Sequence, residues 1–228
     1  MIPLRDDNPA QRIPVVTRLI IVLNVLVFMV ELSVGEGRPE FLREWGIVPG
    51  RLFASFNGET SLPVELMTVF TSMFLHGGWL HLIGNMWYLW IFGDNVEDTM
   101  GSPGFLAFYL AAGAVATGVH AALMPGSSIP TVGASGAIAG VLGAYAQAFP
   151  RARVLTLIPI FFFFQVVAIP ALVLLGIWFV LQFISAALSL GATSGGVAWW
   201  AHIAGFVFGF VTMGMLGRRR RTRAERVS

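Results

Sequence analysis

An uncharged, glycine-rich run extends over residues 133–149 and has the sequence GASGAIAGVLGAYAQAF. Its glycines after the serine recur at helical spacing, and they are Gly136, Gly140 and Gly143. A second apolar run carries Gly205 and Gly209, which are also four residues apart. Small residues at this spacing let two membrane helices approach backbone to backbone. We therefore expect a pair of membrane helices that pack through glycine faces.

The composition of the whole chain is that of a membrane protein. Of its 228 residues, 56% are hydrophobic and 11% are charged, whereas soluble proteins average about 25% charged residues. The formal charges between Leu66 and Gly217 are few, and they are Asp94, Glu97, Asp98, Arg151 and Arg153. Long uncharged stretches predict membrane spans, because a helix needs about 20 apolar residues to cross a hydrocarbon core of roughly 30 Å.

Hydropathy predicts an all-α membrane protein, folded as a bundle of six transmembrane helices. The expected spans cover residues 15–32, 80–92, 105–123, 135–149, 169–190 and 199–216. Residues 155–164 are interpreted as a short interfacial or re-entrant piece, because the uncharged stretch around them is too long for one crossing. The fourth span is short, since sixteen residues from Ser135 to Pro150 cover only about 24 Å. Ser135 is therefore expected below the outer surface, where water must reach it through a cavity.

The arginines predict the orientation of the chain. With six spans both termini lie on one side, and the arginines on that side are Arg5, Arg12, Arg18, Arg151, Arg153 and those of the C-terminal tail. The positive-inside rule makes this side cytoplasmic. We expect a cytoplasmic N-terminal segment at residues 1–14, a membrane domain at 15–216 and a basic cytoplasmic tail at 217–228. The first run lacks a small-residue cleavage site, so it is interpreted as an uncleaved span of a multi-pass protein in a bacterial plasma (inner) membrane.

The sequence pI of about 9.7 has its main source in the tail. The tail arginines directly follow an apolar run, and they are Arg218 to Arg221, Arg223 and Arg226. Such a cluster is typical of a topology anchor on anionic cytoplasmic lipid, so nucleic acid is not an expected partner. The chain has no cysteine, which excludes disulfides and thiolate metal sites. The sequence leaves the oligomeric state undetermined.

Ser135 lies at the expected start of a helix, with Gly133 and Gly136 close on either side. Glycine permits a tight turn and a close approach of other groups. The unpaired amides and the positive dipole end of the helix would lie beside the serine hydroxyl, an arrangement suited to binding an oxyanion. The alternative is that Ser135 is only an N-cap, which is a common use of serine and the better reading of this motif taken alone.

His202 lies in the middle of an otherwise apolar span. An unpaired buried polar group costs about 2 kcal/mol or more, so this imidazole requires a partner. Close packing of the two glycine faces would bring the hydroxyl of Ser135 within hydrogen-bonding reach of His202. That geometry activates a serine as a nucleophile.

His81 and Asn85 are four residues apart and therefore share one face of a helix. Both side chains can donate hydrogen bonds to a developing oxyanion, a contribution of about 3 kcal/mol each. Alternatively, they form a polar pair that holds helices together. His76 and His81 have a spacing that does not match a zinc-protease motif, and we expect no metal. His120 is expected to have a packed or interfacial role.

These residues resemble the motifs of rhomboid intramembrane serine proteases in their order and spacing. The motifs are Phe70-Thr71-Ser72-Met73-Phe74-Leu75-His76, His81-x-x-x-Asn85, Gly133-Ala134-Ser135-Gly136 and His202-x-x-Gly205-x-x-x-Gly209. The resemblance covers about residues 70–216. It implies a rhomboid-like six-helix fold, a dyad of Ser135 and His202 without an aspartate, and no cofactor. It also implies an oxyanion hole formed by the Ser135 amide with His81 and Asn85.

Two positions depart from the family's pattern. The Trp-Arg pair of the first loop falls on Met67-Thr68, and the tyrosine that often follows the serine by four residues is Ala139. The orientation of the His202 ring must then be set by other residues. By the same resemblance, residues 35–66 would lie half in the outer leaflet. The fifth span and residues 191–198 would act as gate and cap.

From these residues we expect an intramembrane serine endopeptidase that acts in the lipid bilayer. Its substrates would be single-span membrane proteins, hydrolysed in or near their transmembrane segments. Two other classes stay open: a transporter or channel whose histidines line a path, and a non-catalytic binder of membrane helices. A channel would conduct without Ser135, and a binder would retain its clients while Ser135 fails to react with a fluorophosphonate.

Overall fold

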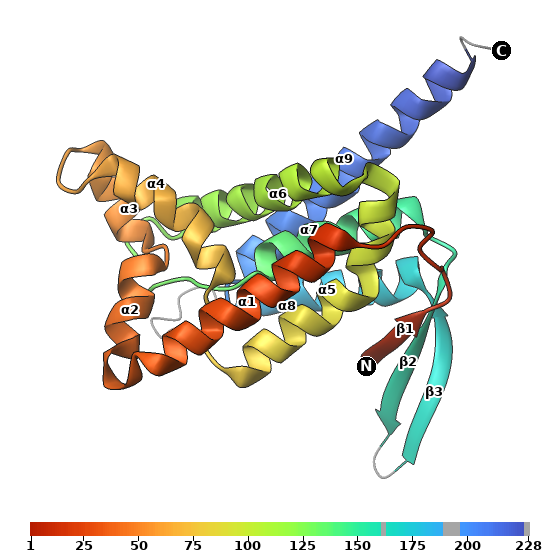
Figure 1. The fold of residues 1–228 in the computed structure, drawn as a ribbon, viewed down its shortest axis with the longest axis horizontal. Helices are drawn as coiled ribbons and strands as arrows, with labels where there is room; N and C mark the ends of the chain where they lie inside the picture. The colour runs from red at the N-terminus through yellow and green to blue at the C-terminus, as the bar shows by residue number, and fades with distance from the viewer. Residues whose placement is uncertain (161–162, 189–196, 226–228) are drawn as a thin grey trace.

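The computed structural model describes residues 1–160, 163–188 and 197–225, and the fold is mostly helical (Figure 1). Its helices are α1 (Val15–Ser33), α2 (Arg38–Trp45), α3 (Pro49–Phe56), α4 (Leu62–Thr71), α5 (Trp79–Met100), α6 (Ser102–Leu123), α7 (Ser135–Ala148), α8 (Ala171–Leu188) and α9 (Trp199–Glu225). Its strands are β1 (Ile2–Asp6), β2 (Arg153–Ile160) and β3 (Phe163–Pro170), and its 3-10 turns are η1 (Gly35–Gly37) and η2 (Ser72–Phe74). The predicted helical membrane fold is confirmed.

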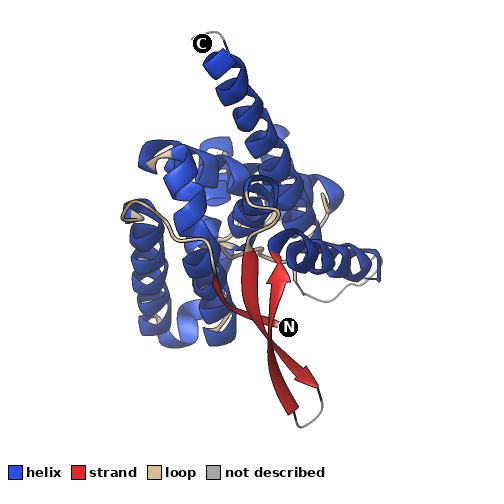
Figure 2. Ribbon diagram, turned by 90° about the vertical axis from the view of Figure 1, so that its right-hand side faces the viewer, coloured by secondary structure: helices blue, strands red, loops and turns tan. Residues whose placement is uncertain are grey.

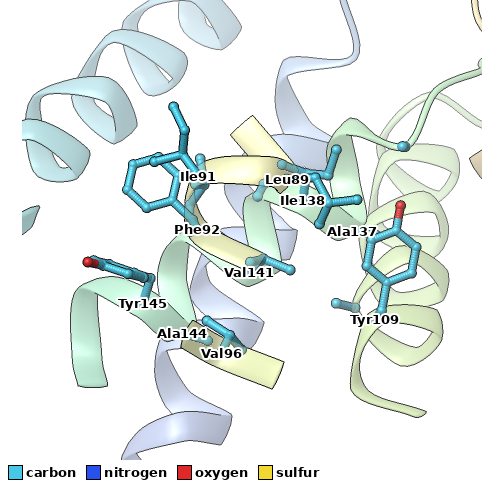
Figure 3. Close-up of a cluster of buried hydrophobic side chains, with 14 of the residues drawn as sticks. Leu89, Ile91, Phe92, Val96, Tyr109, Ala137, Ile138, Val141, Ala144 and Tyr145 are labelled. Carbon is cyan, nitrogen blue, oxygen red and sulfur yellow. The ribbon is translucent and has the colours of Figure 1, made fainter. Parts of the chain in front are cut away.

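Helix α7 lies inside the bundle, where it packs against α5, α6, α8 and α9. Every residue from Gly136 to Ala146 is buried. A helix that is apolar all round requires neighbours on all sides, which the surrounding helices provide. Figure 3 shows part of this core, whose labelled side chains are Leu89, Ile91, Phe92 and Val96 of α5, Tyr109 of α6, and Ala137, Ile138, Val141, Ala144 and Tyr145 of α7.

The contact between α7 and α9 is made by backbone rather than by side chains. A methyl group on Gly205 or Gly209 of α9 would overlap a carbonyl oxygen of α7. The oxygens concerned are those of Gly136 and Gly140, respectively. The predicted packing through glycine faces is therefore confirmed, and it fixes the separation of the two helices.

Four helices of the described chain are long and apolar enough to cross a membrane alone: α1, α6, α8 and the first 19 residues of α9. A fifth candidate is formed by α5 with the preceding helical segment Leu62–Phe74, which is bent from it by 80°. Helix α7 has 14 residues and so spans about 21 Å, short of the roughly 30 Å of a hydrocarbon core. The chain is thus an integral membrane protein, and the six predicted spans overlap α1, α5, α6, α7, α8 and α9. Residues 169–170 of the fifth predicted span belong to β3 instead, and residues 189–190 lie outside the described part of the chain. Six full crossings remain a prediction.

A three-stranded antiparallel sheet in the order β1-β2-β3 accompanies the helices. Figure 2 shows the strands projecting from the helical bundle. The described residues of the stretch 155–164 lie in β2 and β3, which pair from Arg153↔Pro170 to Ile160↔Phe163, and their interfacial or re-entrant position remains a prediction. Valine, isoleucine, threonine and phenylalanine dominate this stretch and favour strands, whereas hydropathy alone cannot distinguish an apolar strand from an apolar helix.

The N-terminal segment is bound to the bundle through this sheet. Strand β1 pairs with β2, and the Tyr145 hydroxyl at the end of α7 donates a hydrogen bond of 2.5 Å to Asp6. These contacts hold together the C-terminal end of α7, strand β1 and the β2–β3 hairpin. That this segment is cytoplasmic remains a prediction.

We predict that Gly209→Ala destabilises the protein by about 2 kcal/mol or more, because the new methyl group would overlap the backbone of α7. The measurement is thermal unfolding of the purified protein in detergent. Gly118→Ala in α6 is the matched control, since a methyl group there meets no atom within 4 Å. Alanine is also the better helix former, so the control should unfold at or slightly above the wild-type temperature. Equal unfolding temperatures for the two variants would contradict the close contact.

Candidate functional site

Ser135 is the first residue of α7 and follows a turn that only glycine can make. Gly133 has a φ of 127°, and its N–H donates to the Ser72 carbonyl oxygen at 2.8 Å. A β-carbon on Gly133 would lie 2.7 Å from Cε1 and Nε2 of His81, so the chain passes directly beside that ring. The turn brings the Ser135 hydroxyl to the N-terminus of α7, where the first amides lack partners within the helix.

His202 of α9 meets this hydroxyl directly. Its Nε2 lies 2.8 Å from Ser135 Oγ, and its side chain is only 8% exposed. The two residues stand next to the glycine contacts of their helices, with Gly136 following the serine and Gly205 three residues after the histidine. Backbone contact between α7 and α9 therefore sets the distance between the hydroxyl and the imidazole.

The other ring nitrogen of His202 is bound by a residue that the sequence did not single out. Nδ1 lies 2.7 Å from Oε1 of Gln182 in α8, and this glutamine is 9% exposed. In the sequence, Gln182 was recognisable as an amide in an otherwise apolar helix. The sequence alone does not show which neighbouring helix that amide faces. Ala139 stands where the resemblance to the rhomboid motifs implied a stacking tyrosine, and the His202 ring packs instead against Trp178 and Trp199 at 6.0 Å between centroids.

His81 and Asn85, both on α5, line the same cavity as Ser135 and His202. The N–H of Gly77 donates to Nδ1 of His81 at 3.3 Å. Because Nδ1 accepts this bond, the neutral ring carries its hydrogen on Nε2, which lies beside Gly133. Asn85 contacts the ring of His76, with 3.0 Å between Nδ2 and Nε2. The amide of Asn85 retains a second hydrogen that can be donated elsewhere.

The loop before α5 is held by an ion pair that sequence analysis missed. Glu31 at the end of α1 is fully buried, accepts the His76 N–H at 2.9 Å and pairs with Arg38 at 3.2 Å. Arg38 also donates to the His76 carbonyl oxygen at 2.6 Å. In the sequence, the signal for this ion pair was the carboxylate of Glu31 at the end of an apolar run. These contacts anchor the first loop, and Met67-Thr68 stands where the resemblance implied a Trp-Arg pair.

The polar side chains face an open cavity of about 1390 Å³. Its walls also include His120 of α6 and the segment from Met124 to Val132. Small-molecule pockets usually hold about 300–1,000 Å³, so this volume suits a longer, extended ligand. Among the described residues, no group of three or more His, Cys, Asp or Glu side chains could hold a metal ion. Most of the expected cap, residues 191–198, lies outside the described part of the chain.

Comparison with known proteins assigns the family. The model of the Rhomboid domain matches residues 63–219, which is more than half of the chain. The chain is 39% identical over 132 residues to rhomboid protease GluP of Bacillus subtilis, covering 58% of this chain and 24% of that protein. It is 32% identical over 125 residues to presenilin-associated rhomboid-like protein A, mitochondrial, of Danio rerio, covering 54% and 33%.

The presenilin-associated rhomboid-like protein, mitochondrial, of Bos taurus is 28% identical over 170 residues, covering 70% of this chain and 41% of that protein. The chain thus spans less than half the length of each of these three relatives. The match to the domain model includes every polar residue of the cavity named above. The chain belongs to the rhomboid family.

Proposed function

We propose that the chain is an intramembrane serine endopeptidase in which Ser135 is the nucleophile and His202 the general base. The observation that carries the proposal is the 2.8 Å contact between Ser135 Oγ and His202 Nε2 inside an open cavity. A nucleophile and a base within hydrogen-bonding distance are the minimum that acyl transfer requires. Membership of the rhomboid family supports the same reaction, because one of the three relatives named above is a rhomboid protease.

The reaction begins when His202 Nε2 accepts the proton of the Ser135 hydroxyl and Oγ attacks the substrate carbonyl carbon. The carbonyl oxygen becomes an oxyanion, which the Ser135 amide, Nε2–H of His81 and the free N–H of Asn85 stabilise. His202 then returns the proton to the leaving amine, and the peptide bond breaks. Water, deprotonated by the same imidazole, hydrolyses the acyl-enzyme and restores Ser135. No cofactor takes part in these steps.

The substrates we propose are single-span membrane proteins whose helices unwind easily near the outer surface. A peptide bond inside an intact helix is shielded by its own hydrogen bonds, so local unwinding must precede attack. The cavity volume of about 1390 Å³ is sufficient for several residues of extended chain. We propose the bacterial plasma membrane as the location, with the basic tail on the cytoplasmic side.

We predict that Ser135→Ala and His202→Ala each abolish cleavage of a transmembrane substrate by the purified protein reconstituted in liposomes. The first change removes the attacking oxygen and the second removes the group that accepts its proton. Cleavage is followed by gel electrophoresis and mass spectrometry. Ser185→Ala is the matched control, because this serine of α8 is not among the described residues that line the cavity. If either dyad variant cleaves as fast as this control, the assignment of that residue is wrong.

We predict that Asn85→Ala lowers kcat by about 10²–10³, the usual effect of removing one oxyanion donor, with a smaller change in KM. The alternative is that Asn85 only holds helices together through His76. Measurements of kcat, KM and thermal unfolding on the folded variant separate the two roles. A variant that unfolds at a lower temperature but retains kcat within about threefold would support the purely structural role.

A further inference from the structure

We propose that Gln182 is a positioning residue for the general base, holding His202 in the tautomer and orientation that accept the Ser135 proton. The inference rests on the function proposed above and extends the dyad to a third side chain. It is carried by the 2.7 Å contact between Gln182 Oε1 and His202 Nδ1, made by two buried residues.

The chemistry of the two atoms fixes the tautomer. The amide oxygen of glutamine can only accept a hydrogen bond, so Nδ1 of His202 must be the donor. In a neutral imidazole the other nitrogen, Nε2, then carries a lone pair, and Nε2 faces Ser135 Oγ at 2.8 Å. The opposite tautomer would place a hydrogen on Nε2, where it could not accept the serine proton. Gln182 thus selects the reactive form of the base.

The same contact fixes the ring in space. On α7, no tyrosine lies four residues after Ser135 to stack on the His202 ring, because that residue is Ala139. Trp178 lies one helical turn before Gln182 and packs against the same imidazole. Two side chains of α8 therefore hold the base of α9, one through its ring face and one through a hydrogen bond. The base is oriented only while α8 is docked against α9.

A neutral amide also leaves the histidine without a counter-ion. The titratable side chains that share the cavity with His202 are His81 and Tyr88 of α5 and His120 of α6. None of the described lining residues is a carboxylate. The imidazolium formed during the reaction is thus held by a dipole rather than by a full charge. Replacing the Gln182 amide with a carboxylate should therefore change the pH dependence of Ser135 reactivity measurably.

The test compares Gln182→Leu, Gln182→Glu and the control Leu181→Ala, whose side chain is 53% exposed on the outer face of the same helix. The rate of Ser135 labelling by a fluorophosphonate is measured from acidic to alkaline pH, together with substrate cleavage. We expect Gln182→Leu to slow both by about tenfold or more, part of the roughly 10²–10⁴ supplied by a positioned base. The control should match the wild type.

Gln182→Glu should recover a large part of the labelling rate, because its carboxylate also accepts from Nδ1. In the plot of labelling rate against pH, the midpoint of the acid limb should move to higher pH by about one unit or more. A neighbouring negative charge favours the protonated His202 ring, and the protonated ring cannot act as a base. A merely structural role would lower the rate in proportion to lost folded protein and leave this midpoint unchanged. That result, or labelling of Gln182→Leu at the control rate, would overturn the proposal.

A second readout does not depend on activity. In the protein labelled with ¹⁵N-histidine, the two nitrogens of a neutral ring have distinct chemical shifts that report which one carries the hydrogen. We expect His202, assigned by its loss in His202→Ala, to carry it on Nδ1 in the wild type. Gln182→Leu should show a mixture of tautomers, and an unchanged Nδ1–H form would contradict the inference. If folded wild-type protein is not labelled at Ser135 at all, the proposed function falls together with this inference.

Discussion

The backbone contact between α7 and α9 is the constraint on which the rest of the structure depends. Two membrane helices can come this close only where both lack side chains, and Gly136, Gly140, Gly205 and Gly209 meet that condition. The contact leaves little freedom in the distance between the helices. Ser135 and His202 stand at one end of it, so the geometry of the site follows directly from helix packing.

The cost of burying polar groups explains the remaining side chains around the cavity. A buried polar group is stabilised by a hydrogen-bond partner, and hydrogen bonds join several of these side chains in two connected sets. The first joins Ser135 and His202 to Gln182. The second joins Glu31 and Arg38 through His76 to Asn85. The helices that carry these groups must all be in place for the site to exist, and they are α1, α2, α5, α7, α8 and α9.

The sequence was sufficient for the helices at the six predicted spans and for the approach of Ser135 to His202, because both follow from local patterns. The shorter helices α2, α3 and α4 were not predicted. Apolar runs define helices, and glycines at four-residue spacing define the faces that can touch. The hairpin of β2 and β3 was not predictable from hydropathy, since its apolar strands and an apolar helix look alike. Gln182 and Glu31 were visible as polar residues in apolar surroundings. Their partners lie 20 and 45 residues away, at His202 and His76, and only the folded chain identifies them.

The most direct test of this account is an experimental structure of the full chain in lipid, in which the distance between Ser135 Oγ and His202 Nε2 is measured. We expect a hydrogen-bonded pair that faces a water-filled cavity, with the two glycine faces in contact behind it. Side chains that point away from each other, with lipid or packed protein between them, would contradict it.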